Sequence, residues 1–265
     1  MQADTVIRNA RIVDGAGTPW FRGDVAIAGG RITAVGRLPD GIQAKTVIDA
    51  KDRYLTPGFI DTHTHSDFVL LENPGAEGKL VQGVTTQAIG HCGYSGAPIA
   101  DETFRAYSDY VGFLRAGVEP EWNWRSFGQW LDRLEKLPLG NNVVSFVGHA
   151  TVWTAVMGFA NRRPDAAELA KMVDLVKASM DEGACGMTSG LIYSPGMTCP
   201  PDEVSAVAAG LRDKRGLYAS HMRNESWNLL ASMEETIDVG SKNGNPIQIS
   251  HVKAVGNDNH GLLPK

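Results

Sequence analysis

Leu55-Thr-Pro-Gly-Phe-Ile-Asp-Thr-His-Thr-His65 is the stretch that decides the fold of this chain. A Pro-Gly turn precedes a short apolar strand, which leads into His63 and His65. Residues two apart on an extended strand point to the same face, so both imidazoles should project from one strand end. Imidazole is the commonest metal ligand among side chains. The stretch therefore predicts half of a metal site, with two solvated histidines at a polar strand end as the alternative.

Length and composition bound the class of protein. The 265 residues carry a net charge of −5 and are 43% hydrophobic, which suits a globular chain with one large domain and one small one. The acidic balance, without a Lys/Arg cluster, argues against nucleic acid or an anionic membrane as a partner. Residues 1–11 lack a basic and apolar leader pattern, so we expect a cytoplasmic protein. The oligomeric state is not encoded in these patterns.

The N-terminal region predicts a small β module. Short β-prone runs alternate with turn residues, and we expect strands at 5–7, 11–13, 24–27, 31–35 and 46–48. Residues 1–55 thus form one domain of the predicted organisation, and residues 56–265 form the other.

The second region alternates strand-like runs with amphipathic segments. Helices are predicted at 126–137, 165–182, 202–215 and 225–241, and strands near residues 59, 84, 143, 184, 217 and 247. This alternation predicts an α/β fold built from βα units around a parallel sheet, a (β/α)₈ TIM-type barrel. About six of the eight strands are present, so we expect the chain to be incomplete at its C-terminus.

Five candidate metal ligands share one position in this scheme. His63 and His65 follow the first strand, Cys92 the second, His221 the fifth and His251 the sixth. The C-terminal ends of barrel strands face one end of the barrel, where active sites of this fold lie. We therefore expect these side chains to converge on a metal, although a strand-end histidine can also bond a carbonyl and a cysteine can simply be buried.

At this point the sequence resembles a known family. The matching stretches are 55–65, 77–86, 90–98, 183–195, 221–223 and 250–253. They are similar to the D-aminoacylase (N-acyl-D-amino-acid deacylase) branch of the amidohydrolase superfamily. The resemblance implies a zinc-dependent barrel flanked by a β-sandwich, of which residues 1–55 are the N-terminal part. It also implies hydrolysis of a small-molecule substrate, an N-acyl-D-amino acid, to a carboxylate and a free D-amino acid.

The resemblance also implies roles for individual residues. Cys92, His221 and His251 match a tight zinc site, and His63 and His65 match a weaker second one. The latter is completed by an aspartate that also serves as general base and is expected beyond residue 265.

Three further residues are candidates for holding the substrate carboxylate. Tyr193 and Lys253 match the family's positions for this task, and Arg223 is a third candidate because guanidinium grips carboxylates in pairs of hydrogen bonds. Ordinary ion pairs are the alternative for Lys253 and Arg223. Asp67 is predicted to hold the second nitrogen of a ligand histidine.

Two other functions stay open. Many relatives bridge two metals with a lysine at the end of the fourth strand, but residues 183–190, Gly-Ala-Cys-Gly-Met-Thr-Ser-Gly, contain none. This favours the thiolate of Cys92 in that place and argues against a cyclic-amide hydrolase of the hydantoinase or dihydroorotase type. An inactive metal-binding fragment that lacks the catalytic aspartate is the other alternative.

Overall fold

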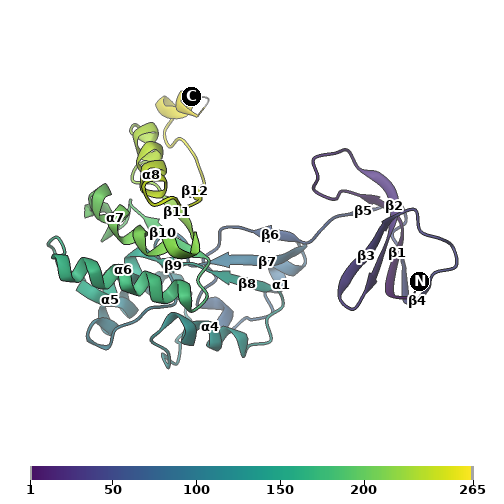
Figure 1. Cartoon of the computed structure of the whole chain (residues 1–265), viewed down its shortest axis with the longest axis horizontal. Coiled ribbons are helices and arrows are strands. Elements are labelled where there is room, and N and C mark those ends of the chain that lie inside the picture. The colour runs from purple at the N-terminus through teal and green to yellow at the C-terminus, as the bar shows by residue number, and fades with distance from the viewer. Residues whose placement is uncertain (1, 264–265) are drawn as a thin grey trace. The chain divides into compact units, whose positions relative to one another are not determined.

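The computed structural model describes residues 2–263. The chain divides between Phe59 and Ile60 into two compact units (Figure 1). The assignment of residues 1–55 to a β-sandwich and of 56–265 to a barrel domain stays a prediction.

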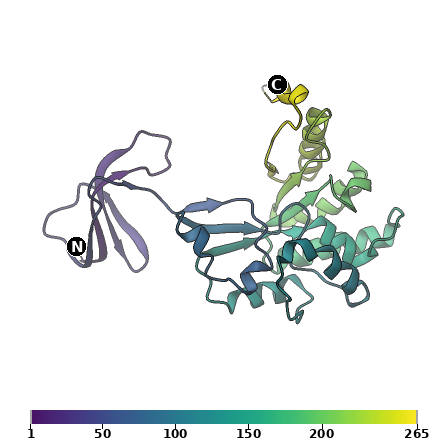
Figure 2. The ribbon, with the colours of Figure 1, turned by 180° about the vertical axis from the view of Figure 1, so that it is seen from behind.

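The first unit is a five-stranded sheet of order β3-β2-β1-β4, with β5 also paired to β1 (Figures 1 and 2). Its strands are β1 Gln2–Ile12, β2 Phe21–Ala28, β3 Arg31–Gly36, β4 Gln43–Asp49 and β5 Tyr54–Leu55. The two strands predicted at 5–7 and 11–13 are one strand, β1. A register shift between Ile7 and Ala10, where Asn9 has φ of 58°, interrupts its pairing with β2, and asparagine tolerates this conformation better than most residues.

The second unit contains the predicted row of strands. These are β6 Phe59–Asp61, β7 Val84–Ile89, β8 Asn142–Ser145, β9 Val147–Gly148, β10 Gly186–Gly190, β11 Leu217–His221 and β12 Ile247–Ile249. The segment 142–148 pairs in parallel with β7 through β8 and with β10 through β9. It therefore joins the row β6-β7-β8 to the row β9-β10-β11-β12. All six predicted strand positions are confirmed, and the third is split at Phe146.

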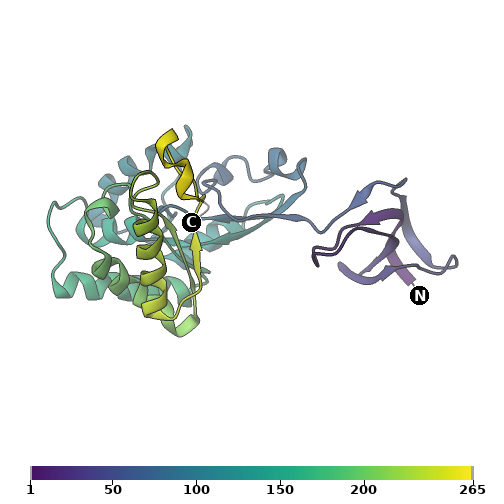
Figure 3. The same ribbon diagram turned by 90° about the horizontal axis from the view of Figure 1, so that it is seen from above.

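Helices pack against this row in chain order. They are α1 Glu77–Leu80, α2 Phe104–Tyr110, α3 Gly112–Arg115, α4 Phe127–Glu135, α5 His149–Met157, α6 Ala166–Asp181, α7 Pro201–Ala208 and α8 Leu229–Asn243. Helix α6 contacts α5 and α7, α7 contacts α8, and α8 lies along β12 (Figure 3). Met172, Val176 and Met180 turn one face of α6 into the core, as the helical spacing predicts.

The predicted helices differ from the observed ones in several places. The short helices α1, α2 and α3 were not predicted. Helix α5 was not predicted either, because eight of its nine residues are buried and it shows no alternation of polar and apolar faces. The predicted helix 202–215 is α7 followed by a 3₁₀ helix, Ala209–Lys214. Helix α8 starts at Leu229 and not at 225, because the side chain of Asn224 accepts bonds from the backbone of Ser226 and Asn228 and holds a turn there. Among the helices that the structure describes, none has the length and apolar character required to cross a bilayer.

The N-terminus of α6 gives a test of the local assignment. Asp165 accepts a hydrogen bond from the Glu168 amide at 2.8 Å, and Glu168 accepts one from the Asp165 amide at 2.9 Å. Asp165→Ala should lower the free energy of unfolding by about 1 kcal/mol, the usual cost of losing such a cap. Asp174→Ala, the same change at an exposed position inside α6, is the control and should not destabilise. Equal losses in urea unfolding would contradict the assignment.

Candidate metal centre

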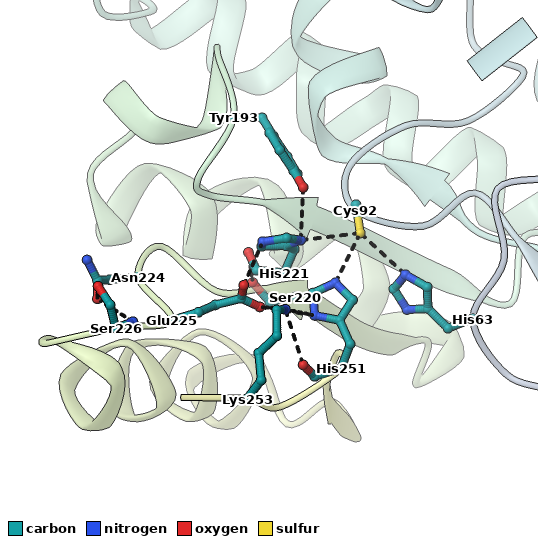
Figure 4. Close-up of polar contacts among 10 residues, drawn as sticks. All are labelled: His63, Cys92, Tyr193, Ser220, His221, Asn224, Glu225, Ser226, His251 and Lys253. Atoms are coloured by element: carbon teal, nitrogen blue, oxygen red, sulfur yellow. Dashed lines mark hydrogen bonds and ion pairs between the residues drawn. The ribbon is translucent and has the colours of Figure 1, made fainter. Parts of the chain in front are cut away.

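The five predicted ligands lie at the C-terminal ends of four strands. His63 and His65 follow β6, Cys92 follows β7, His221 is the last residue of β11, and His251 follows β12 by two residues. The side chains of His63, Cys92, His221 and His251 point toward one another (Figure 4). The structure therefore brings together residues that are up to 188 positions apart, from His63 to His251.

The thiol of Cys92 is the common contact. Its Sγ lies 3.4 Å from Nε2 of His63, 3.6 Å from Nδ1 of His221 and 3.6 Å from Nε2 of His251. Two groups of possible ligands share this sulfur: His63, His65 and Cys92 form one, and Cys92, His221 and His251 form the other. In each group the ligand atoms lie within 4.8 Å of one another.

The spacing fits a tetrahedral ion. With a metal–sulfur bond of about 2.3 Å and a metal–nitrogen bond of about 2.0–2.1 Å, as for zinc, tetrahedral angles place sulfur and nitrogen about 3.5–3.6 Å apart. The distances from Sγ of Cys92 to the ring nitrogens of His221 and His251 match this value. Thiolate and imidazole are also the donors that zinc prefers. The residues present therefore fit such an ion.

A tight turn after β7, residues 90–93, places Cys92 beside the histidines. Gly90, Cys92 and Gly93 all have positive φ, at 82°, 55° and 85°, and the amide of Tyr94 donates to the carbonyl of His91 at 3.0 Å. A Cβ at Gly90 would lie 2.2 Å from the carbonyl oxygen of Phe146. Only glycine fits there, because the turn is pressed against the backbone between β8 and β9.

Burial sets the protonation of these groups. It lowers the pKa of His63 to about 4, helped by the charge of His251, and lowers that of His221 to about 4 against the opposing effect of Glu225. Both rings are therefore neutral near pH 7 and each has a nitrogen lone pair. Burial also raises the pKa of the Cys92 thiol to about 12. At neutral pH the thiol is thus protonated as long as no cation lies beside it. A nearby cation favours its thiolate form.

Glu225 is a site residue that the sequence analysis missed. The residue is 6% exposed. Its carboxylate faces the ammonium of Lys253 and one ring nitrogen each of His221 and His251. Oε1 lies 3.1 Å from Nδ1 of His251 and 2.5 Å from Nζ of Lys253, and Oε2 lies 3.5 Å from Nε2 of His221. Its spacing of four residues from His221 was the available signal, but position 225 falls at the start of the predicted helix 225–241.

Two of the predicted substrate residues lie beside the ligands. The hydroxyl of Tyr193 is 3.4 Å from Nδ1 of His221. The ammonium of Lys253 lies 3.2 Å from Nδ1 of His251, and its side chain is 47% exposed. Both therefore reach the cluster and keep access to a ligand that enters it.

Arg223 lies differently. Its Nε and Nη2 donate to the carboxylate of Glu235, at 2.9 and 2.7 Å. Its remaining N–H groups donate to the carbonyls of Gly196, Met197 and Cys199. All five N–H donors of the guanidinium are engaged, so Arg223 ties the loop that follows β10 to helix α8.

Asp67 does not take the predicted role. It is buried, and burial raises its pKa to about 7. Within residues 2–263, neither of its carboxylate oxygens accepts a hydrogen bond from a side chain. The prediction that it holds a ligand histidine is wrong, and the carboxylate that faces His221 and His251 belongs to Glu225.

Comparisons with known proteins agree with this geometry. A model of the amidohydrolase family matches residues 46–259. The chain is 38% identical to an N-acyl-D-aspartate deacylase of Alcaligenes xylosoxydans xylosoxydans, over 98% of this chain and 51% of that protein.

Two solved structures superpose closely. A D-aminoacylase studied for its binuclear metal centre matches with a TM-score of 0.86 and 33% identity, over 97% of this chain and 53% of the other. An N-acyl-D-glutamate deacylase of Bordetella bronchiseptica, complexed with zinc and a phosphonate inhibitor, matches with a TM-score of 0.87 and 32% identity, over 98% and 53%. The chain spans about half the length of these relatives. The likeness confirms the predicted α/β fold of the (β/α)₈ barrel type.

The turn at Gly90 provides the test of this site's construction. Gly90→Ala adds a Cβ that meets the Phe146 carbonyl, and Gly244→Ala adds one in open space at a similar φ of 70°. Both variants should lose about 1–2 kcal/mol because alanine disfavours positive φ. Gly90→Ala should lose a further 1–3 kcal/mol, roughly, from overpacking. The two free energies of unfolding are compared by chemical denaturation, and equal values would show that the Gly90 turn is not crowded.

Proposed function

This chain belongs to the amidohydrolase family, and from that premise we propose that the protein hydrolyses the amide bond of N-acyl-D-amino acids to a carboxylate and a free D-amino acid. The observation that carries the proposal is the contact of the Cys92 thiol with histidines from three other strands. The names of the relatives, deacylases of N-acyl-D-aspartate and N-acyl-D-glutamate, support the linear amide and the D configuration. Because the chain spans about half of their length, the proposal concerns the activity of the whole protein.

The proposed cofactor is zinc. Cys92, His221 and His251 would hold one ion tightly, and His63 and His65, with Cys92 shared, would hold a second one more weakly. The complex of the similar glutamate deacylase with zinc and the binuclear centre of the similar D-aminoacylase support this assignment. Zinc at such a site supplies Lewis-acid polarisation of an amide carbonyl and acidifies water.

The remaining residues would bind and orient the substrate. The half-exposed ammonium of Lys253 would pair with the substrate carboxylate, and the hydroxyl of Tyr193 would donate a hydrogen bond to it. Arg223 is proposed to hold the loop that carries Tyr193 and not the substrate itself, since its donors are engaged. A general-base aspartate on the eighth strand and a cytoplasmic location stay predictions.

Strand β10 separates this proposal from a cyclic-amide hydrolase. Its residues, Gly-Met-Thr-Ser-Gly, lack the lysine expected of the hydantoinase type. Assays of hydantoins beside N-acyl-D-amino acids and their L enantiomers separate the two reactions. Turnover of hydantoins alone would overturn the proposed substrate class.

Zinc content tests the metal site. The purified chain, dialysed against a weak chelator, should keep about one zinc per chain, as a Cys-His₂ site predicts. Cys92→Ala should lose it, because the sulfur that both groups share is removed. Cys199→Ala, which also removes a buried thiol but lies outside both groups, is the control. Retention of zinc by Cys92→Ala in a folded protein would contradict the assignment.

Steady-state kinetics test the role of Lys253. The assay uses a full-length protein, as long as the relatives. In it, Lys253→Met should raise KM for an N-acetyl-D-amino acid by about 10- to 100-fold, because a charged hydrogen bond to the substrate is lost. The value of kcat should change less if the contact serves binding. Lys242→Met, an exposed lysine on α8, is the control. An unchanged KM in a Lys253→Met protein that retains zinc would exclude this role.

A further inference from the structure

Glu225 is a buried acid that faces the proposed tight site from the side opposite Cys92. In Figure 4 the rings of His221 and His251 lie between the sulfur and the carboxylate. Each ring turns one nitrogen to Cys92 and the other to Glu225. Nδ1 of His221 and Nε2 of His251 face the sulfur, and Nε2 of His221 and Nδ1 of His251 face the carboxylate.

Each carboxylate oxygen of Glu225 contacts a different histidine. Oε1 lies 3.1 Å from Nδ1 of His251, and Oε2 lies 3.5 Å from Nε2 of His221. Both are ion-pair contacts, and the second is longer than an ordinary hydrogen bond. Nε2 of His221 is buried and has no hydrogen-bond partner within residues 2–263. Glu225 is therefore the acceptor available to it.

The arrangement selects the tautomers that a metal requires. A neutral imidazole has one N–H donor and one lone pair. A carboxylate on one side favours the N–H on that side, and the lone pair of each ring then faces Cys92. His251 shows why the charge matters, since the ammonium of Lys253 lies 3.2 Å from the same Nδ1 and 2.5 Å from Oε1 of Glu225. An ammonium can only donate to Nδ1, which would place the imidazole proton on the metal side, whereas the carboxylate beside it favours the proton on Nδ1.

The backbone holds Glu225 in place from two directions. Its carbonyl accepts a hydrogen bond from the amide of Val255 at 2.7 Å, which ties it to the segment after His251. The Asn224 side chain fixes the turn that follows, through the amides of Ser226 and Asn228. These bonds fix the backbone of the residue that carries the carboxylate.

We infer that Glu225 is a positioning residue: its single carboxylate orients His221 and His251 for the metal and holds Lys253 beside them. The inference rests on the proposed ligand set. It links two strand ends, β11 and β12, through one side chain from the loop after β11. Metal affinity and the geometry of the bound ion then depend on a residue that touches neither metal nor substrate.

The test measures metal binding directly in Glu225→Gln. Glutamine keeps the shape but has one acceptor oxygen and no charge, so the two rings can no longer both be served. Competition with a chromophoric chelator should show zinc binding weakened about 10- to 100-fold, as for other residues that hold a ligand histidine. The ligand-field and thiolate charge-transfer bands of the Co²⁺ protein should shift as well. Glu203→Gln, which removes another buried acid in an ion pair with Arg163, is the control and should change neither.

The outcomes of this experiment distinguish a failure of the positioning role of Glu225 from a failure of the proposed metal site. Unchanged zinc affinity and Co²⁺ spectrum in Glu225→Gln would overturn the inference, as would an equal loss in Glu203→Gln. If Glu225→Gln does not fold, Glu225→Asp decides: its shorter carboxylate should weaken zinc binding, and parental affinity would overturn the role. Failure of the parent chain to bind zinc would instead refute the proposed metal site.

Discussion

The contact of the Cys92 thiol with three imidazoles is the constraint on which the second unit depends. The buried thiol of Cys92 and the buried ring of His221 are costly to desolvate unless they have partners, and here the thiol lies 3.4–3.6 Å from the rings of His63, His221 and His251. Such a cluster forms only if the strands run in parallel and end together. The strand order is β6-β7-β8, continued by β9-β10-β11-β12, and the pairs β7–β8, β9–β10, β10–β11 and β11–β12 are parallel. The cluster of ligands at the strand ends thus depends on the order of the strands in the sheet.

The same constraint reaches the backbone beneath the cluster. A Cβ at Gly93 would lie 2.9 Å from the amide nitrogen of Gly190, and one at Gly190 would lie 2.1 Å from the carbonyl of Cys92. The turn after β7 and the end of β10 therefore pack main chain against main chain. This contact places Cys92 at the level of the histidines, and it requires glycine at both positions. Gly190, the last residue of β10, thus serves this packing.

The sequence predicts features that depend on local patterns and misses those that depend on three-dimensional surroundings. Helix α6 was predictable because Asp165 and Glu168 form a capping box and its apolar residues recur at helical spacing. The strand ends with His63, His221 and His251 were predictable because a parallel sheet places such residues at one edge. Helix α5 was missed because burial on all sides removes the periodic signal. Glu225, and not Asp67, faces the ligand histidines, since which acid lies behind a ligand histidine depends on loops that no spacing rule describes.

The two cations beside the site illustrate this last point, because the sequence offers both as partners for a substrate carboxylate. Arg223 and Lys253 each follow a ligand by two residues, yet their surroundings differ. The planar guanidinium of Arg223 has five donors in fixed directions, and Glu235 with three carbonyls of the loop after β10 occupies them. The ammonium of Lys253 is a point charge on a flexible stem with one carboxylate partner and about half of its side chain in solvent. The first is fixed by its hydrogen bonds and stabilises a loop, whereas the second is held by Glu225 alone among carboxylates and stays half exposed, which is why the substrate contact is proposed for Lys253 and not for Arg223.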